Sequence, residues 1–257
     1  AAAAKPRTSM RRRVRRMLLK HIPPHMTINQ ITWQVGSLRE VVDGSNWLKG
    51  SGIRIARAGR DNPGSNWHAY PVDPEGHINE IYYGIEQIGW DGFSKPKGMH
   101  RRDYHDVPAL PHRSEFAEVE EGLAAKIAVE DGHRFKEPLD ETYDVGGILL
   151  GRPFKVTKIG PIRIFVEDVA AVTAFYRETM GLRLTEEIVW NGHRCSFLRA
   201  NTEHHSLAIY PAALREELGL SAHTSLFSCG FQLGDYAQLR AAVDFMQGQG
   251  VTVRKLP

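Results

Sequence analysis

Alternating apolar and polar positions predict a strand near the start of the chain, over Thr27–Val35. A helical stretch follows from Gly36 to Lys49-Gly50, where glycine is the expected stop. Three further strands are predicted at residues 53–55, 67–72 and 78–83. The predicted order is therefore strand, helix and three strands.

The second half of the chain has the same predicted order. Ile159–Val166 has the pattern of a strand, and Val169–Met180 that of an amphipathic helix ended by Gly181. Strands are then predicted at Leu182–Glu187, Cys195–Ala200 and Ser206–Tyr210. Adjacent His204 and His205 are predicted to place one imidazole on each face of a strand, so that at most one points into a cavity.

One segment of the chain occurs twice, because residues 223–253 repeat residues 25–55 with a constant offset of 198. Glycines carry much of the match: Gly36 pairs with Gly234, Gly50 with Gly248 and Gly52 with Gly250. Glycines at fixed spacing predict the same helix stop and the same turn, and hence one repeated supersecondary unit. The second copy reaches Pro257 before any counterpart of residues 58–83, so its module is expected to be incomplete.

These patterns predict an α+β fold of repeated strand–helix–three-strand modules. The expected parts are a basic segment (1–24), a first module (25–92), a connection with one helix (93–155) and a second region (156–257). The helix of the connection is predicted from apolar residues three and four positions apart: Phe116, Val119, Leu123 and Ile127.

Composition and charge indicate which broad class of protein the chain belongs to. Of 257 residues, 42% are hydrophobic and 25% charged, and no run of 18 apolar residues occurs, which is typical of a soluble protein without a membrane-spanning helix. Two cysteines are too few for a disulfide framework, so a reducing, cytoplasmic setting is expected. Residues 1–24 hold eight Lys or Arg and no acid, and the rest has 25 basic and 30 acidic residues, a net of −5. No nucleic-acid partner is expected for the body.

The basic segment has several interpretations: a targeting peptide, an RNA-binding arm, a solvated tail or a helix packed on a partner. The chain starts at Ala1 with Met10 inside, as a fragment or a processed chain would. No GxSxG, P-loop, GxGxxG or HExxH motif occurs, which disfavours serine hydrolases, P-loop nucleotidases, dinucleotide enzymes and zincins.

The repeated module, with FYRETMGL in one copy and DPEGHINEIYY in another, resembles the vicinal oxygen chelate superfamily. That superfamily includes glyoxalases, bleomycin-resistance proteins and extradiol dioxygenases, and the chain most resembles the type I extradiol ring-cleaving dioxygenases. The resemblance covers about residues 25–92 and 156–257. It implies paired modules whose curled mixed sheets surround a cavity, with a site where Fe(II), or Mn(II), binds a catechol and O2. Such a site needs a face of two histidines and one carboxylate.

Several residues correspond to functional positions of that family. The resemblance implies that Glu80 is the carboxylate metal ligand, Tyr70 the active-site tyrosine and His205 the acid/base histidine. His68, two residues before Tyr70 and on the same strand face, is a candidate substitute acid/base. Asp61 stands where the family has a histidine beside the ligands.

Three family histidines are replaced, by Gln30, Pro161 and Ser228. Three explanations stay open: a degraded site that leaves a binding protein, altered ligands such as Gln30 with Glu80, or ligands from modules not included in the chain. The expected function is cleavage of a catechol-type aromatic ring with O2 by a metalloenzyme, with Glu80 and Gln30 as the expected metal ligands. A metal-free module that binds a small aromatic or a partner, and a glyoxalase-like isomerase or lyase, are the alternatives. Unpaired strand edges favour a homo-oligomer.

Overall fold

The computed structural model describes residues 28–60, 66–85, 99, 111, 114–128 and 138–253. The chain divides into two compact units, residues 1–30 with 161–229 (unit 1) and residues 31–160 with 230–257 (unit 2). Each is α+β, as predicted. Within the described ranges, no helix is both long enough and apolar enough to cross a membrane.

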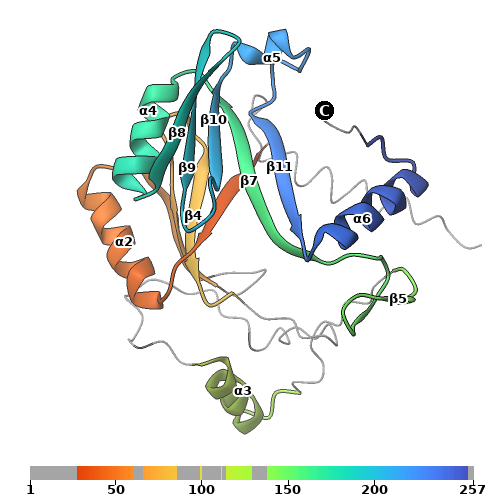
Figure 1. Ribbon diagram of the computed structural model, residues 1–257. Coiled ribbons are helices and arrows are strands. Elements are labelled where there is room, and N and C mark those ends of the chain that lie inside the picture. The colour runs from red at the N-terminus through yellow and green to blue at the C-terminus, as the bar shows by residue number, and fades with distance from the viewer. Residues whose placement is uncertain are drawn as a thin grey trace, which may run out of the picture. The chain divides into compact units, whose positions relative to one another are not determined.

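Unit 2 contains the first predicted module. Its elements are β1 (Gln30–Gln34), α2 (Leu38–Gly50), β2 (Ile55–Arg60), β3 (Trp67–Pro71) and β4 (Ile78–Tyr83), with sheet order β1-β4-β3-β2. The order of elements agrees with the sequence prediction and β4 has the predicted bounds, whereas β2 lies later than predicted and shares only Ile55 with the expected strand at 53–55. The sheet is shown with α2 beside it in Figure 1.

Helix α2 begins later than predicted because Ser37 caps it. The Ser37 side chain accepts a hydrogen bond from the Glu40 backbone N–H, and the Glu40 carboxylate accepts one from Gly36, 2.6 Å away. This reciprocal arrangement is a capping box. The helix buries Leu38, Val41 and Val42 against the sheet. Strand alternation then leaves the opposite face of the sheet free of this helix.

Unit 1 contains the second predicted module. Its elements are β7 (Val156–Val166), α4 (Val169–Ala174), a π-helical turn η3 (Phe175–Thr179), β8 (Arg183–Trp190), β9 (His193–Arg199), β10 (Leu207–Pro211), α5 (Leu214–Glu217) and β11 (Leu226–Leu233). The sheet order is β11-β7-β10-β9-β8, with β10 parallel to β7 and antiparallel to β9. The sheet is therefore mixed, as predicted. Strands β7 and β11 extend beyond the unit at one end.

The two faces of the unit 1 sheet differ. Ile164, Leu198 and Ile209 are fully buried and belong to the face on which α4 packs. The alternate positions face the other way and are largely aromatic: the buried cluster there contains Phe165, Cys195, Phe197, Ala208 and Tyr210. Figure 1 shows α4 alongside β8 and β9.

The helix predicted over Val169–Met180 is not α-helical throughout. It changes to a π-helical turn at Phe175, where the backbone N–H of Met180 donates to the Phe175 carbonyl. Periodicity alone does not predict this change, because the apolar spacing of the two forms overlaps over one turn. The predicted stop is confirmed: Gly181 has φ of +77°, a conformation that glycine adopts without steric cost.

The internal repeat is confirmed at the level of helix boundaries. Helix α6 (Tyr236–Gly248) begins and ends 198 residues after α2. Asp235 caps α6 as Ser37 caps α2, and the glycines after the two helices, Gly52 and Gly250, have φ of +77° and +79°.

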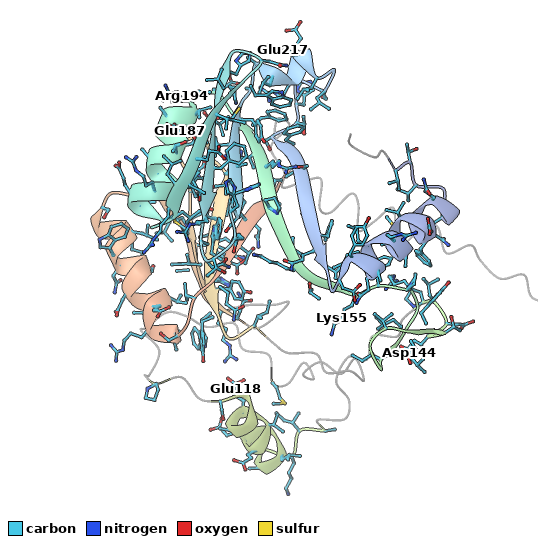
Figure 2. All side chains as sticks on the ribbon, in the orientation of Figure 1. Glu118, Asp144, Lys155, Glu187, Arg194 and Glu217 are labelled. Carbon is cyan, nitrogen blue, oxygen red and sulfur yellow. The ribbon has the colours of Figure 1, made fainter. Side chains whose placement is uncertain are left out.

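The connection contains the predicted helix as α3 (Glu115–Ala124), together with a small hairpin of β5 (Tyr143–Asp144) and β6 (Leu149–Leu150). Helix α3 carries Glu118, labelled in Figure 2. Arg60 of β2 donates two hydrogen bonds to this carboxylate, at 2.9 and 3.1 Å. Both side chains are nearly buried, so this pair attaches α3 to the sheet of unit 2.

Candidate functional site

The face of the unit 2 sheet opposite α2 carries polar side chains from three strands. Glu80 on β4 is buried, with 4% of its surface exposed. Its Oε1 accepts a hydrogen bond from Asn66 Nδ2 at 2.7 Å, and its Oε2 accepts one from Thr32 Oγ1 at 3.3 Å. Both carboxylate oxygens are therefore held by neighbours from other parts of the module.

Tyr70 and His68 lie beside Glu80 on this face. The His68 and Tyr70 rings pack edge to face with centroids 4.6 Å apart, and His68 Nδ1 lies 3.8 Å from Glu80 Oε1. Both residues are buried. The structure thus brings together three of the residues singled out from the sequence.

Arg57 adds a positive charge to this group, with its guanidinium carbon 4.6 Å from the centre of the Tyr70 ring. Burial raises the pKa of Tyr70; Arg57 opposes this by hydrogen bonding and charge, and Glu80 adds to it. Tyr70 therefore keeps its proton at neutral pH and is able to donate a hydrogen bond.

Two other sequence candidates are less well defined. Gln30 is the first residue of β1, half-buried and two positions before Thr32, so alternation puts it on the same face as Thr32. Asp61 lies outside the described residues.

A second group of polar side chains lies in unit 1, around His205. The His205 imidazole packs edge to face on Phe197, with ring centroids 5.0 Å apart. Its Nε2 is buried and has no hydrogen-bond partner among the described residues. An imidazole nitrogen in this condition is ready to exchange a proton with a bound ligand.

The charge around His205 favours its neutral form. Burial lowers its pKa from 6.5, the positive charges of Arg163 and His204 lower it further, and Glu203 opposes them. Arg163 is on β7 and donates to Ser228 Oγ at 3.2 Å, while its Nε is buried without a partner among the described residues. His205 is therefore an unprotonated base at neutral pH, next to a cation that would stabilise an anion.

Aromatic rings continue along the same face of the unit 1 sheet. Phe165 stacks on Phe227 at 5.0 Å between centroids, and Tyr210 packs edge to face on both Phe227 (5.1 Å) and Phe197 (6.0 Å). Trp190 completes the group, 5.9 Å from Tyr210. These rings pack on one another as a buried aromatic cluster.

His204 and His205 lie outside β10, which starts at Leu207, one residue after the predicted start at Ser206. The prediction that these imidazoles lie on opposite faces is wrong: their Nδ1 atoms are only 3.0 Å apart. Alternation does not apply because both residues lie in the irregular segment before the strand.

The described residues do not fit a metal site with two histidines and one carboxylate. No three His, Cys, Asp or Glu side chains gather there in a way that could hold an ion. Pro161 has no side-chain donor atom, Ser228 accepts from Arg163, and the Glu80 oxygens already accept hydrogen bonds.

Sequence reasoning did not single out four residues of these two groups: Thr32, Arg57, Asn66 and Arg163. Asn66 follows the Pro-Gly-Ser turn of GRDNPGSN, which indicated a loop but no contact with Glu80. Arg163 is two residues after Pro161, so alternation could have placed it on the same strand face. No sequence signal indicates that His204 contacts His205.

Comparison with known proteins gives a consistent fold. Residues 158–257 match the family model of the Glyoxalase/Bleomycin resistance protein/Dioxygenase superfamily. No curated protein matches the sequence significantly. The chain does resemble several solved structures.

One similar solved structure is the 2,3-dioxygenase LapB from Pseudomonas sp. KL28, with a TM-score of 0.54 and 17% sequence identity. The match covers 90% of this chain and 62% of LapB. A catechol 2,3-dioxygenase has a TM-score of 0.52 and 20% identity over 88% and 58%. The Mn(II)-bound glyoxalase from Novosphingobium aromaticivorans has a TM-score of 0.51 and 13% identity over 88% and 53%. The chain spans less than two thirds of the length of each, and at these identities the likeness shows the fold.

Proposed function

Because residues 158–257 belong to the glyoxalase/bleomycin resistance protein/dioxygenase superfamily, we propose that the protein is an extradiol-dioxygenase-like enzyme that acts on a catechol-type aromatic. His205 is the base that takes a phenolic proton, and the aromatic face of unit 1 holds the ring. The observation that carries this proposal is the buried Nε2 of His205, which has no hydrogen-bond partner among the described residues. A neutral imidazole nitrogen in this condition is able to accept a proton from the hydroxyl of a bound phenol.

The surroundings of His205 suit a catechol in three respects. Phe197 packs against the imidazole and offers apolar contact to a planar ligand. The Arg163 guanidinium favours the phenolate over the neutral phenol. The lowered pKa of His205 keeps the imidazole free to accept the proton at neutral pH.

We also propose the polar face of unit 2, taken by itself, as a candidate oxygen-stabilising site. Tyr70 keeps its proton and donates a hydrogen bond, which suits it to stabilise an oxygen that gains negative charge. His68 and Glu80 orient Tyr70 through the contacts described above. Gln30 and Asp61 remain candidates for this group.

Ring cleavage with O2 also requires a divalent metal, Fe(II) or Mn(II), and the described residues do not fit a complete site for one. This observation favours a second candidate function, a module protein that binds a small aromatic without cleaving it. The two candidates share the role of His205 in binding and differ in turnover.

The test uses 4-nitrocatechol, whose absorption spectrum reports its ionisation, at a pH where the free compound is neutral. Wild type is expected to bind it as the anion. His205→Gln keeps a hydrogen-bonding side chain of similar length but cannot take a proton, so the bound compound stays neutral. His193→Gln is the matched control, because His193 pairs with Glu217 at an exposed position, 2.7 Å apart.

Absence of binding, or equal ionisation by wild type and His205→Gln, would overturn the proposal. Anaerobic loading with Fe(II) or Mn(II), followed by O2 and a panel of catechols, then tests turnover. A yellow ring-fission product that falls about 10²–10⁴-fold in His205→Gln supports the dioxygenase. Ionising binding without product under either metal overturns ring cleavage and leaves the binding module.

A further inference from the structure

Arg163 is a partly buried cation on the aromatic face of the unit 1 sheet. Its Nη1 donates a hydrogen bond to Ser228 Oγ at 3.2 Å, and its Nε is buried without an acceptor. Within the described part of the chain, no carboxylate pairs with this guanidinium. A buried donor on a charged group is costly to leave without an acceptor. The guanidinium therefore has the features of a binding group for an anion that the described residues do not supply.

Strand register places Arg163 on the same face as the surroundings of His205. Arg163 on β7 is the partner of Ala208 on β10, and Ala208 is the partner of Phe197 on β9. Directly opposite residues of neighbouring strands point to the same side of a sheet. Phe197 packs on the His205 imidazole, with ring centroids 5.0 Å apart. Two buried nitrogens without hydrogen-bond partners, Arg163 Nε and His205 Nε2, therefore lie on one face of one sheet.

The geometry of the guanidinium determines which anions suit it. Arginine stays protonated throughout the pH range in which proteins are studied, so its charge is permanent. Nη1 is used by Ser228, which leaves the edge formed by Nε and Nη2. The two N–H groups of this edge are parallel, and such a pair binds two neighbouring oxygens better than one. The monoanion of a catechol has two neighbouring oxygens on one ring.

The same guanidinium disfavours a metal ion at this place. Pro161 and Ser228 stand where the family resemblance implies ligand histidines, and neither supplies an imidazole. The Arg163 side chain reaches Ser228 instead. A divalent cation bound at Ser228 would lie next to a permanent positive charge and would be repelled by it.

We propose that Arg163 takes the place of a metal ion in unit 1, and that its guanidinium binds the oxyanion of an aromatic ligand through Nε and Nη2. Binding at this site is then independent of a divalent metal. The choice of a catechol-type ligand rests on the function proposed above, and the inference concerns binding, which both candidate functions share.

The test measures the affinity of the full-length protein for 4-nitrocatechol at a pH where the free compound is already the monoanion, so that His205 need not take a proton. Wild type treated with a chelator is expected to bind as tightly as wild type supplemented with Mn(II). Arg163→Gln removes the charge and the two-donor edge, and the affinity is expected to fall by about 10–100-fold. Arg163→Lys keeps the charge alone, and its affinity is expected to lie between the two.

The matched control is Arg194→Gln. Arg194 is also in unit 1, on β9, but its side chain is exposed and pairs with Glu187 at 3.5 Å. This variant is expected to bind 4-nitrocatechol as wild type does. The same substitution at the two arginines therefore separates the loss of a specific binding group from a general loss of positive charge.

A second compound tests the two-donor edge. 4-Nitrophenol has one ring oxygen where 4-nitrocatechol has two neighbouring ones, and wild type is expected to prefer the catechol when both are anions. Arg163→Gln is expected to lose most of this preference. The preference is a ratio of two affinities of the same sample, so a partly unfolded variant does not alter it.

Binding that is lost on chelation and restored by Mn(II), or equal affinity and equal preference in wild type and Arg163→Gln, would overturn this inference. The ionisation experiment at lower pH separates it from the proposed function. Anion binding that requires Arg163, without ionisation of the neutral compound by wild type, contradicts the role of His205 alone. Ionisation by His205 together with binding that does not require Arg163 contradicts the role of Arg163 alone, and absence of binding at both pH values contradicts both.

Discussion

The pKa of His205 is set at the residue scale by groups with opposing effects. Burial contributes most to lowering it, the charges of Arg163 and His204 act in the same direction, and Glu203 acts against them. Because its pKa is lowered, the His205 imidazole is neutral at neutral pH and is able to act as a base. It becomes protonated, and loses this ability, as the pH falls through its pKa.

Replacing either charged neighbour is expected to move the His205 pKa in a known direction. Arg163→Gln removes a group that lowers the pKa, so the pKa rises toward 6.5. Glu203→Gln removes a group that raises it, so the pKa falls further below 6.5. An NMR titration of the His205 ring measures both shifts, and the acid limb of phenol ionisation should move with them. Shifts of the same sign in the two variants would contradict this electrostatic account.

Sequence reasoning at this scale worked where residues share one strand. His68 and Tyr70 are two positions apart on β3, and alternation placed them on the same face, where their rings meet. It failed for His204 and His205, because an irregular backbone segment before β10 turns both imidazoles toward each other.

At the scale of elements, glycine spacing predicted both copies of the repeated strand–helix unit. Gly50 and Gly248 are the last residues of α2 and α6, and Gly52 and Gly250 follow with positive φ. Gly50 and Gly248 end the helices, whereas Gly52 and Gly250 allow a left-handed turn. The same spacing thus reflects two different physical requirements.

Substitution by alanine separates these two requirements. Gly52→Ala and Gly250→Ala force a left-handed backbone on a residue with a Cβ and should lower the free energy of unfolding by about 1–2 kcal/mol. Gly50→Ala and Gly248→Ala meet no atom within 4 Å and should raise it by about 0.4–1 kcal/mol. Chemical denaturation measures all four. If Gly52→Ala changed the free energy of unfolding as Gly50→Ala does, or Gly250→Ala as Gly248→Ala does, the left-handed conformation would not be required.

At the scale of the molecule, contacts between residues far apart in sequence define the candidate groups. Glu80 is held by Thr32 and Asn66, which are 48 and 14 residues away. The contact between Arg60 and Glu118 crosses 58 residues and attaches a helix of the connection. Such contacts depend on sheet register and loop paths, which no local pattern encodes.

The Arg60–Glu118 pair is expected to contribute specifically to unit 2. Arg60→Met or Glu118→Gln removes this ion pair at a nearly buried position, at a cost of about 3–5 kcal/mol in free energy of unfolding. The double variant Arg60→Met with Glu118→Leu should recover most of that loss. The exposed pair Arg194–Glu187, labelled in Figure 2, is the control, and its double-mutant cycle should give a coupling below about 1 kcal/mol. Similar couplings for the two pairs would contradict the role assigned to burial.

Alternation, glycine spacing and the repeat were sufficient to predict the α+β modules, the helix stops and the strand faces. They were sufficient because strand and helix periods arise from backbone sterics and from burial of one face, which act over a few neighbouring residues. The tertiary structure decided that Asn66 and Thr32 hold Glu80, that the charge of Arg163 acts on His205, and that the His204 ring lies against the His205 ring. These contacts join separate strands, so they exist only once the sheet has its register and the segment before β10 has its bend.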